Sequence, residues 1–393
     1  MLAADAERTT APIPFAVPDI SEAEIQAVVD VMKSGWLTSG KLMRAFEQAV
    51  AAWLSPTSGT PPESVAVNSA TAGLHLALLG LGIGPGDEVI VPTMTFAATA
   101  EVVHAVGARP MLCDVCPDTC NIRLADLEAT LSDRTRAIII VHFAGAVTAE
   151  MAAILVWAKR KGLRIIEDAA HAFGAECGGV RIGALPSDCT VFSFYATKCI
   201  TTGEGGMLVT RDDGLAARAR KLRLHGIDRD VFDRYTGAAS TWEYDVVAPG
   251  WKYNLTDIAA AIGIEQLRRE HPMWSRRVAI ACSYDRLLHR RLRRPAAPDP
   301  PRRDHAWHLY PIRVPDRRDR FINALHDRGI GASVHFKPLH RTTAYACDAQ
   351  RFPGAEAYWP KALSLPLYSS MTESQVARVI ETVNEVATDY YGD

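Results

Sequence analysis

Hydrophobic and polar positions follow two alternating patterns along the first two thirds of the chain. Short, almost continuous apolar runs predict buried strands at 88–93, 109–115, 136–145, 163–170, 189–195 and 205–210. Stretches with apolar residues at helical spacing predict helices at 21–35, 69–83, 99–107 and 149–162. Strands that alternate with helices predict an α/β fold, in which helices cover both faces of a mostly parallel sheet. We expect a large domain over residues 16–255.

The pattern changes after this region. A long, Arg-rich helical stretch is predicted at 257–292, and a Pro- and Arg-rich surface connection follows it at 293–304. Shorter elements come next, with apolar strand-like runs at 305–314 and 331–336 and helical stretches at 317–329 and 372–390. This mixture predicts a smaller C-terminal α+β domain over residues 256–393. Residues 1–15 read as a loose N-terminal arm.

Composition narrows the class of protein. With a formal net charge of -2, the chain has no excess of positive charge that would attract nucleic acid or an anionic membrane. No apolar run approaches the ~18 residues that span a bilayer, and the first fifteen residues lack the apolar region of a signal peptide. We therefore expect a cytoplasmic protein that binds neither nucleic acid nor membrane.

One cysteine cluster raises the question of a metal. Cys113, Cys116 and Cys120 have knuckle-like spacing, but a structural zinc site takes four ligands, usually from two such clusters. No second cluster follows. We expect free thiols and no metal.

Lysine is scarce here, with 9 lysines against 34 arginines. One of them, Lys198, lies in "SFYATKCITTGEGGM", between Ser193 and a glycine-rich run. Arginine keeps its proton near neutral pH, whereas a desolvated lysine can lose it and attack a carbonyl. The sequence of this stretch leaves two interpretations of Lys198, a nucleophile or an ordinary surface charge.

Other candidate groups lie where predicted strands end. Asp168 closes the run at 163–170, at the edge where open α/β sheets bind ligands. Ser69 and Thr71 lie at the N-terminus of a predicted helix, and helix N-termini bind phosphate. Phe96 follows the run at 88–93. Each alone has a structural explanation, as a helix cap or a core side chain. An anion seat, an aromatic wall, a carboxylate and a lysine in this order together match what pyridoxal phosphate requires.

Several blocks of the sequence resemble a known family in fixed order. They include "NSATAGLHLAL" (68–78), "GDEVIVPTMTFAAT" (86–99), "EDAAHAFGA" (167–175), "FSFYATK" (192–198), "TTGEGGM" (201–207) and "WKYNLTDI" (251–258). The chain resembles the DegT/DnrJ/EryC1/StrS sugar aminotransferases, within the fold-type-I pyridoxal-phosphate-dependent transferases. The resemblance implies a mostly parallel, seven-stranded-type sheet in the large domain. It also implies a homodimer with shared active sites.

The resemblance also implies roles for individual residues. Lys198 would bind the cofactor covalently and later carry a proton, and Asp168 would pair with its ring nitrogen. Phe96 and His171 would sandwich the ring. Ala70, Thr71 and Ser193 would hold the phosphate, joined by Asn254 of the neighbouring subunit. Contacts to the sugar nucleotide would come from Trp36, Tyr195 and His335.

The implied reaction is a transamination in which the cofactor alternates between pyridoxal and pyridoxamine phosphate. L-glutamate would donate the amino group, and the 4-keto group of a sugar linked to dTDP or UDP would accept it. The blocks at 251–258, 305–314 and 329–336 resemble enzymes of the UDP-4-amino-4-deoxyarabinose synthase type most. Alternatives are a 3-keto sugar or cyclitol aminotransferase and a non-catalytic regulator on the same fold. Cys199 departs from the Asn that is common in the family, and its role stays open.

Overall fold

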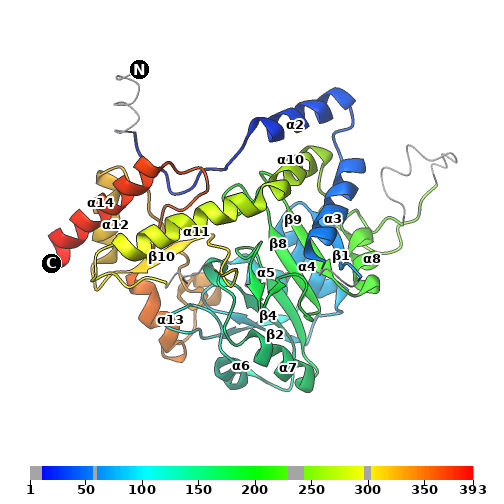
Figure 1. Ribbon diagram of the computed structural model, residues 1–393. Helices are drawn as coiled ribbons and strands as arrows, with labels where there is room; N and C mark the ends of the chain where they lie inside the picture. The colour runs from blue at the N-terminus through cyan, green and yellow to red at the C-terminus, as the bar shows by residue number, and fades with distance from the viewer. Residues whose placement is uncertain (1–10, 56–59, 229–242, 296–301, 393) are drawn as a thin grey trace.

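The computed structural model describes residues 11–55, 60–228, 243–295 and 302–392 (Figure 1). Its centre is a seven-stranded sheet in the order β1-β9-β8-β5-β4-β2-β3. The strands are β1 Glu63–Val67, β2 Glu88–Pro92, β3 Arg109–Cys113, β4 Thr135–Val141, β5 Arg164–Asp168, β8 Cys189–Ser193 and β9 Gly206–Thr210. The pairs from β8 through β5, β4 and β2 to β3 are parallel, and β9 is antiparallel to both neighbours. The prediction of an α/β fold with a mostly parallel sheet is confirmed.

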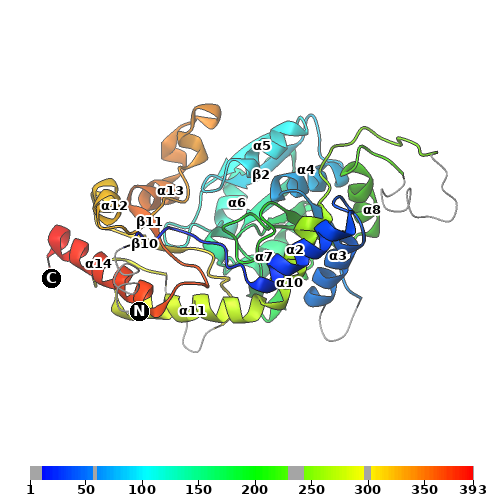
Figure 2. The same cartoon turned by 90° about the horizontal axis from the view of Figure 1, so that it is seen from above.

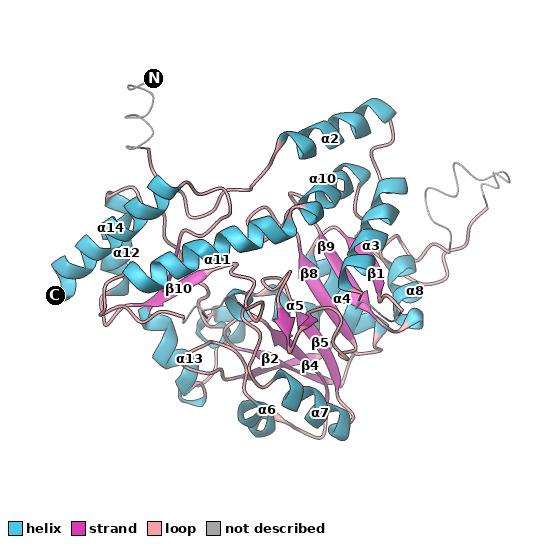
Figure 3. Ribbon diagram, viewed as in Figure 1, coloured by secondary structure: helices cyan, strands magenta, loops and turns pink. Residues whose placement is uncertain are grey.

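Helices cover both faces of this sheet (Figure 3). Successive side chains of a strand point to opposite faces, and β4 shows the consequence. Ile138 and Ile140 join the core under one set of helices, whereas Ala137 and Ile139 join the core under the other. The first set consists of α3 Lys41–Leu54, α6 Leu124–Thr130, α7 Met151–Lys161 and α10 Asp257–Arg268, and the second of α4 Ala70–Gly80, α5 Ala98–Ala105 and α8 Asp213–Leu222.

The C-terminal part forms a smaller unit around a separate core. A two-stranded antiparallel sheet, β10 Tyr310–Arg313 with β11 Ala362–Leu365, packs with helices on this core. The helices of this part are α11 Glu270–Leu287, α12 Arg318–Asp327, α13 Pro353–Tyr358 and α14 Glu373–Tyr391. Helix α11 runs from the large sheet region to the smaller unit, as Figures 1 and 2 both show. The predicted boundary between domains, at residues 255 and 256, stays a proposal.

Several predictions of individual elements need correction. The helix predicted at 257–292 is two helices, because the chain turns at Arg269 between α10 and α11. The segment 331–336 forms only an isolated bridge between Ser333 and Ser364. Part of the expected loose arm is docked, since Ile13 is buried and its backbone bonds Gly329 and Gly331. Residues 1–10 lie outside the described residues.

Helix α2 (Glu22–Ser34) begins as its sequence predicts. The Ser21 hydroxyl and the Glu24 carboxylate form a capping box, which satisfies backbone donors that a helix start leaves unpaired. Gly35 ends the helix with φ 74°, a conformation that suits glycine. This helix packs mainly on α10, and its other face is open to solvent (Figure 1).

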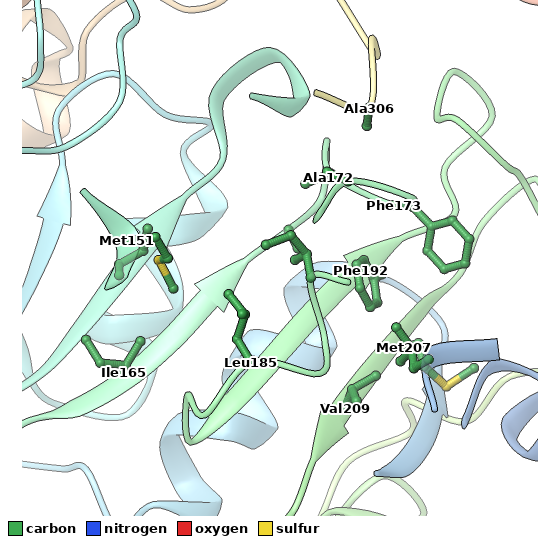
Figure 4. Packing of buried hydrophobic residues seen from close by; sticks show 14 of the residues in the cluster. Met151, Ile165, Ala172, Phe173, Leu185, Phe192, Met207, Val209 and Ala306 are labelled. Carbon is green, nitrogen blue, oxygen red and sulfur yellow. The ribbon is translucent and has the colours of Figure 1, made fainter. Parts of the chain in front are cut away.

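Aromatic packing fixes the segment that follows β5. The Phe173 ring lies 5.0 Å from Phe192 and 5.6 Å from Phe194, measured between ring centroids. It also stacks on Trp53 at 4.6 Å. Figure 4 shows Phe173 and Phe192 beside each other in this core, with Met207 nearby. Because buried side chains pack densely, the backbone around residue 173 has a defined position beside the sheet edge.

Candidate active site

A cavity of about 420 Å³ lies where the parallel strands end. Val141, Asp168 and Ser193, the last residues of β4, β5 and β8, line it. The structure brings together all of the predicted site residues except Trp36 and Asn254. The predicted residues that line the cavity are Ala70, Thr71, Phe96, Asp168, His171, Ser193, Tyr195, Lys198 and His335.

The loop after β8 fixes the backbone of Lys198. Lys198 N donates to the Tyr195 carbonyl at 2.9 Å. The far end of the loop returns to Phe194 at its start: the Phe194 carbonyl accepts from Thr202 N at 2.9 Å, and the Phe194 N–H donates to the Gly205 carbonyl at 2.9 Å. Backbone bonds therefore hold the lysine at the cavity wall.

The environment of Lys198 favours a reactive amine. Burial lowers the pKa of Lys198 to about 8, and the carboxylate of Asp168 opposes this effect. A lower pKa means that more of the amine is neutral near pH 7, and only the neutral form attacks a carbonyl. Lys198 therefore has the properties of a nucleophile.

Asp168 is a buried carboxylate with defined partners. Its Oδ2 accepts a hydrogen bond of 2.8 Å from Thr99 Oγ1, and its Oδ1 accepts one of 3.2 Å from Ala170 N. Burial raises the pKa of Asp168, whereas the bonds from Thr99 and Ala170 and the charge of Lys198 lower it. A cationic group in the cavity would stabilise the ionised form.

The start of α4 offers a seat for an anion. Ser69 caps this helix by accepting from Ala72 N at 3.1 Å, and the first N–H groups of a helix have no partner within it. The neighbouring strand β9 approaches very closely, since a Cβ on Gly206 would lie 2.8 Å from Ala70 N. Only glycine fits there. Ser193 is buried at the same edge.

Rings from both parts of the chain line the cavity. Phe96 and Tyr195 are 61% and 46% exposed, so both offer ring surface to a ligand. His171 is buried, and burial lowers its pKa well below the usual range. His335 stacks on Phe15 with centroids 5.2 Å apart, and burial lowers its pKa to about 4. Both histidines are neutral near pH 7.

The cavity has further lining residues that no sequence motif had indicated as site residues. Thr99 lies in the quoted block 86–99. It is in the first turn of α5, three residues after Phe96, and this position was the one sequence feature that could have indicated it. His308 and Phe336 come from the C-terminal part, with ring centroids 4.4 Å and 5.8 Å from that of His171. Their contact with His171 joins segments far apart in the sequence, so no local pattern indicated it.

Trp36 and Asn254 lie outside this cavity. The Asn254 amide donates to Ser39 Oγ at 2.6 Å, and the indole of Trp36 donates to the Ser39 carbonyl at 3.1 Å. Asn254 lines a separate open pocket of about 900 Å³ together with Ser39 and basic side chains, among them Lys221. Within one subunit, neither residue lines the cavity of Lys198.

Cys199 does not line the active-site cavity, although it follows Lys198 directly. Its thiol is buried against the Ala306 carbonyl at 3.8 Å, and burial raises its pKa. It is a core residue rather than a reactive group. Cys113 and Cys120 are also buried with raised pKa, and among the described residues no three His, Cys, Asp or Glu side chains form a candidate metal site.

His142 belongs to a buried network behind Asp168. Its Nε2 lies 2.8 Å from Glu167 Oε2, and both side chains are fully buried. The other oxygen of Glu167 accepts from Ser187 and from Thr190 Oγ1, at 2.5 and 2.9 Å. These bonds fix the end of β5, where Asp168 lies.

The family model of the DegT/DnrJ/EryC1/StrS aminotransferases matches residues 18–384. The chain belongs to this family. The spore coat polysaccharide biosynthesis protein SpsC of Bacillus subtilis is 42% identical over 386 residues, which is 95% of this chain and 97% of that protein. The protein is therefore a sugar aminotransferase that depends on pyridoxal phosphate.

Solved structures of similar enzymes have the same fold-type-I architecture. The putative sugar aminotransferase Spr1654 of Streptococcus pneumoniae superposes with a TM-score of 0.87 in its pyridoxamine phosphate form, at 34% identity, covering 96% of this chain and 99% of that one. Its pyridoxal phosphate form gives a TM-score of 0.86. The aminotransferase TlmJ of Streptoalloteichus hindustanus gives 0.87 at 35% identity, with 96% and 99% coverage.

The cavity residues fit this cofactor. Lys198 supplies an amine with lowered pKa, Asp168 a buried carboxylate, and the start of α4 an anion seat. Nδ1 of His171 is buried and has no hydrogen-bond partner among the described residues, as in a site that a ligand completes. In the described part of the chain, no helix is long and apolar enough to cross a membrane.

Proposed function

We propose that the protein transfers an amino group from L-glutamate to the 4-keto group of a sugar linked to dTDP or UDP. The product is a 4-amino sugar nucleotide, made from a hexose, with or without a 6-deoxy group, or from a pentose. The aminotransferase chemistry rests on one observation, which is that Lys198 with its lowered pKa shares a cavity with the buried Asp168. The choice of carbon 4 rests on the blocks 251–258, 305–314 and 329–336.

The shape of the site supports a large, polar acceptor. Tyr195 exposes ring surface, and the apolar face of a sugar ring can lie against such a side chain. The neutral His335 offers a ring nitrogen, and its Nδ1 lies 3.1 Å from Ser364 Oγ. The name of SpsC, a protein of polysaccharide biosynthesis, also supports a sugar acceptor.

Bound pyridoxal phosphate supplies an aldehyde carbon for an amine to attack and a ring that accepts an electron pair. Lys198 would hold this cofactor through its side-chain amine. When its amine is free and neutral, Lys198 would take the proton from the α-carbon of glutamate as a general base and hold it as an ammonium group. It would then deliver this proton to carbon 4′ of the cofactor as a general acid. Asp168, which accepts a hydrogen bond from Thr99, would in its ionised form stabilise a protonated ring nitrogen.

In this proposal Ala70, Thr71 and Ser193 would hold the phosphate, and Phe96 and His171 would pack against the ring of the cofactor. We propose a homodimer in which Asn254 of the neighbouring subunit completes the phosphate seat. In a single subunit Asn254 lies outside the Lys198 cavity, which agrees with a role across the interface. Trp36 would contact the sugar nucleotide from the same surface.

The proposal is tested by incubating the purified protein with L-glutamate and a panel of 3-keto and 4-keto sugars linked to dTDP or UDP. Mass spectrometry and NMR identify the products and the position of the new amine. We expect amination at carbon 4. Amination of only 3-keto sugars or cyclitols would instead support the alternative acceptor. No amination, together with no reaction of the bound cofactor with glutamate, would support a non-catalytic regulator.

A further inference from the structure

A second, much smaller cavity adjoins the active site. It measures about 20 Å³ and is lined by residues of the N-terminal segment, the Lys198 loop, helices α10 and α11 and the segment after β11. It shares part of its wall with the active-site cavity. The residues that line both are Thr197, Lys198, His308 and Leu367.

Two buried hydrogen-bond donors line this small cavity. Arg277 and Tyr368 are 3% and 8% exposed. Nη2 of Arg277 and the hydroxyl of Tyr368 have no hydrogen-bond partner among the described residues. Buried polar groups in proteins are almost always paired with protein or with ordered water, so two such donors at one cavity indicate a bound ligand.

The other donors of Arg277 hold two backbone carbonyls. Nη1 donates to the carbonyl of Cys199, the residue after Lys198, at 3.1 Å. Nε donates to the carbonyl of Ala306 at 3.4 Å. Through these bonds, α11 connects the Lys198 loop to the segment that carries His308.

Size and charge identify the ligand as water. A cavity needs at least about 10–15 Å³ to hold one water molecule, and this one measures about 20 Å³. Asp19 also lines the cavity, and its carboxylate accepts from Ser369 Oγ at 2.6 Å and from Arg269 at 2.5 Å. A carboxylate in the wall disfavours a bound anion, whereas it can accept from a water molecule.

We propose that Arg277 is a positioning residue for Lys198, and that its Nη2 and the Tyr368 hydroxyl bind one buried water beside the lysine loop. The water completes the hydrogen bonds of both donors and holds the guanidinium in the orientation that bonds Cys199. Arg277 thereby fixes the carbonyl of Cys199, the residue that follows Lys198. The kinetic consequence rests on the role proposed for Lys198, whereas the water site does not.

Crystal structures test the water site directly. In the wild-type holoenzyme we expect one ordered water within about 2.7–3.2 Å of both Arg277 Nη2 and Tyr368 Oη. In Tyr368→Phe we expect this water to be lost or displaced. Wild-type density without a water in contact with both atoms would overturn the site, whatever the substrate of the enzyme is.

Kinetics of the glutamate half-reaction test the positioning role, followed by the absorbance of the bound cofactor so that no sugar substrate is needed. In Arg277→Met we expect the rate constant to fall on the order of 10- to 100-fold, with the KM for glutamate within about 2-fold. Arg277→Lys keeps the charge and should recover part of the loss. Tyr368→Phe should lower the rate constant a few-fold.

Two variants serve as matched controls. Arg276→Met removes the neighbouring arginine of α11, which bonds Glu373 and the Met371 carbonyl instead. Tyr310→Phe removes another buried hydroxyl of the C-terminal part that lines neither cavity. If Arg277→Met and Tyr368→Phe react as fast as their controls, the positioning role is wrong. If Arg277→Met does not fold, Tyr368→Phe against Tyr310→Phe decides.

Discussion

Thr99 donates a hydrogen bond of 2.8 Å to Asp168, although the two residues lie 69 positions apart in the sequence. Thr99 is at the start of α5, and its hydroxyl is also 2.7 Å from that of Thr95. A hydrogen bond to the charged form of a carboxyl stabilises that form. Thr99 therefore works against the burial that raises the pKa of Asp168.

Replacing this donor should weaken cofactor binding. We expect Thr99→Val to raise the Kd of pyridoxal phosphate about 10-fold, since a hydrogen bond to a charged group contributes about 1.5–3 kcal/mol. The pKa of Asp168 should rise, because the remaining effects favour its protonated form. Titration of the apo-protein followed by absorbance measures the Kd. Thr99→Ser keeps the hydroxyl and should behave like wild type; equal weakening by both variants would contradict this role.

The pKa of Lys198 predicts how cofactor capture depends on pH. The reactive form is the neutral amine, and the folded protein lowers the pKa from 10.5 to about 8. The rate at which the apo-protein captures pyridoxal phosphate should therefore rise about 10-fold per pH unit below 8 and level off above it. Stopped-flow absorbance measures this rate. A rise that continues to pH 10 would show an unperturbed lysine.

Replacing Gly206 should weaken the binding of the cofactor phosphate in particular. In Gly206→Ala the new Cβ would lie 2.7 Å from the Ser69 carbonyl carbon, so the start of α4 must move away from β9. We expect a lower Tm and a larger loss of affinity for pyridoxal phosphate than for pyridoxal, which lacks the phosphate. Gly84→Ala is the control, because its Cβ would contact only Val106 O at 3.8 Å. Equal losses for both ligands would place the effect outside the phosphate seat.

Mixed dimers test the shared site. Lys198→Ala and Asn254→Ala should each be nearly inactive as homodimers. When the two variants are unfolded together and refolded, half of the dimers are mixed, and each mixed dimer has one site with both native residues. We expect about a quarter of wild-type activity, measured as amino sugar formation. No recovery, with mixed dimers demonstrated by differently tagged chains, would show that Asn254 acts within its own subunit.

The periodicity of apolar residues predicted most of the sheet, because its central strands are buried on both faces and appear as continuous apolar runs. Strand β1 was not predicted: it is defined by pairing with β9, which lies about 140 residues further along the chain. The break at Arg269 was also not predicted. The residues on both sides of Arg269 have helical spacing, so the apolar pattern did not indicate that α10 ends and α11 begins there.

The site was predictable as far as its residues lie in motifs at strand ends. Asp168, Ser193 and Lys198 follow this rule, because parallel strands bring their carboxyl ends to one edge. Arg277, His308 and Phe336 do not, since their role depends on how the C-terminal part folds back over that edge. Cys199 could be interpreted only from its burial against Ala306.

The central claim is that Lys198 carries the cofactor, and one measurement tests it directly. The purified holoenzyme is reduced with borohydride, which makes the bond between lysine and cofactor permanent, and its peptides are then mapped by mass spectrometry. Of the 9 lysines in the chain, only Lys198 should carry the added mass, and Lys198→Ala should carry none. The added mass on another lysine, or on none while the cofactor is bound, would contradict the account.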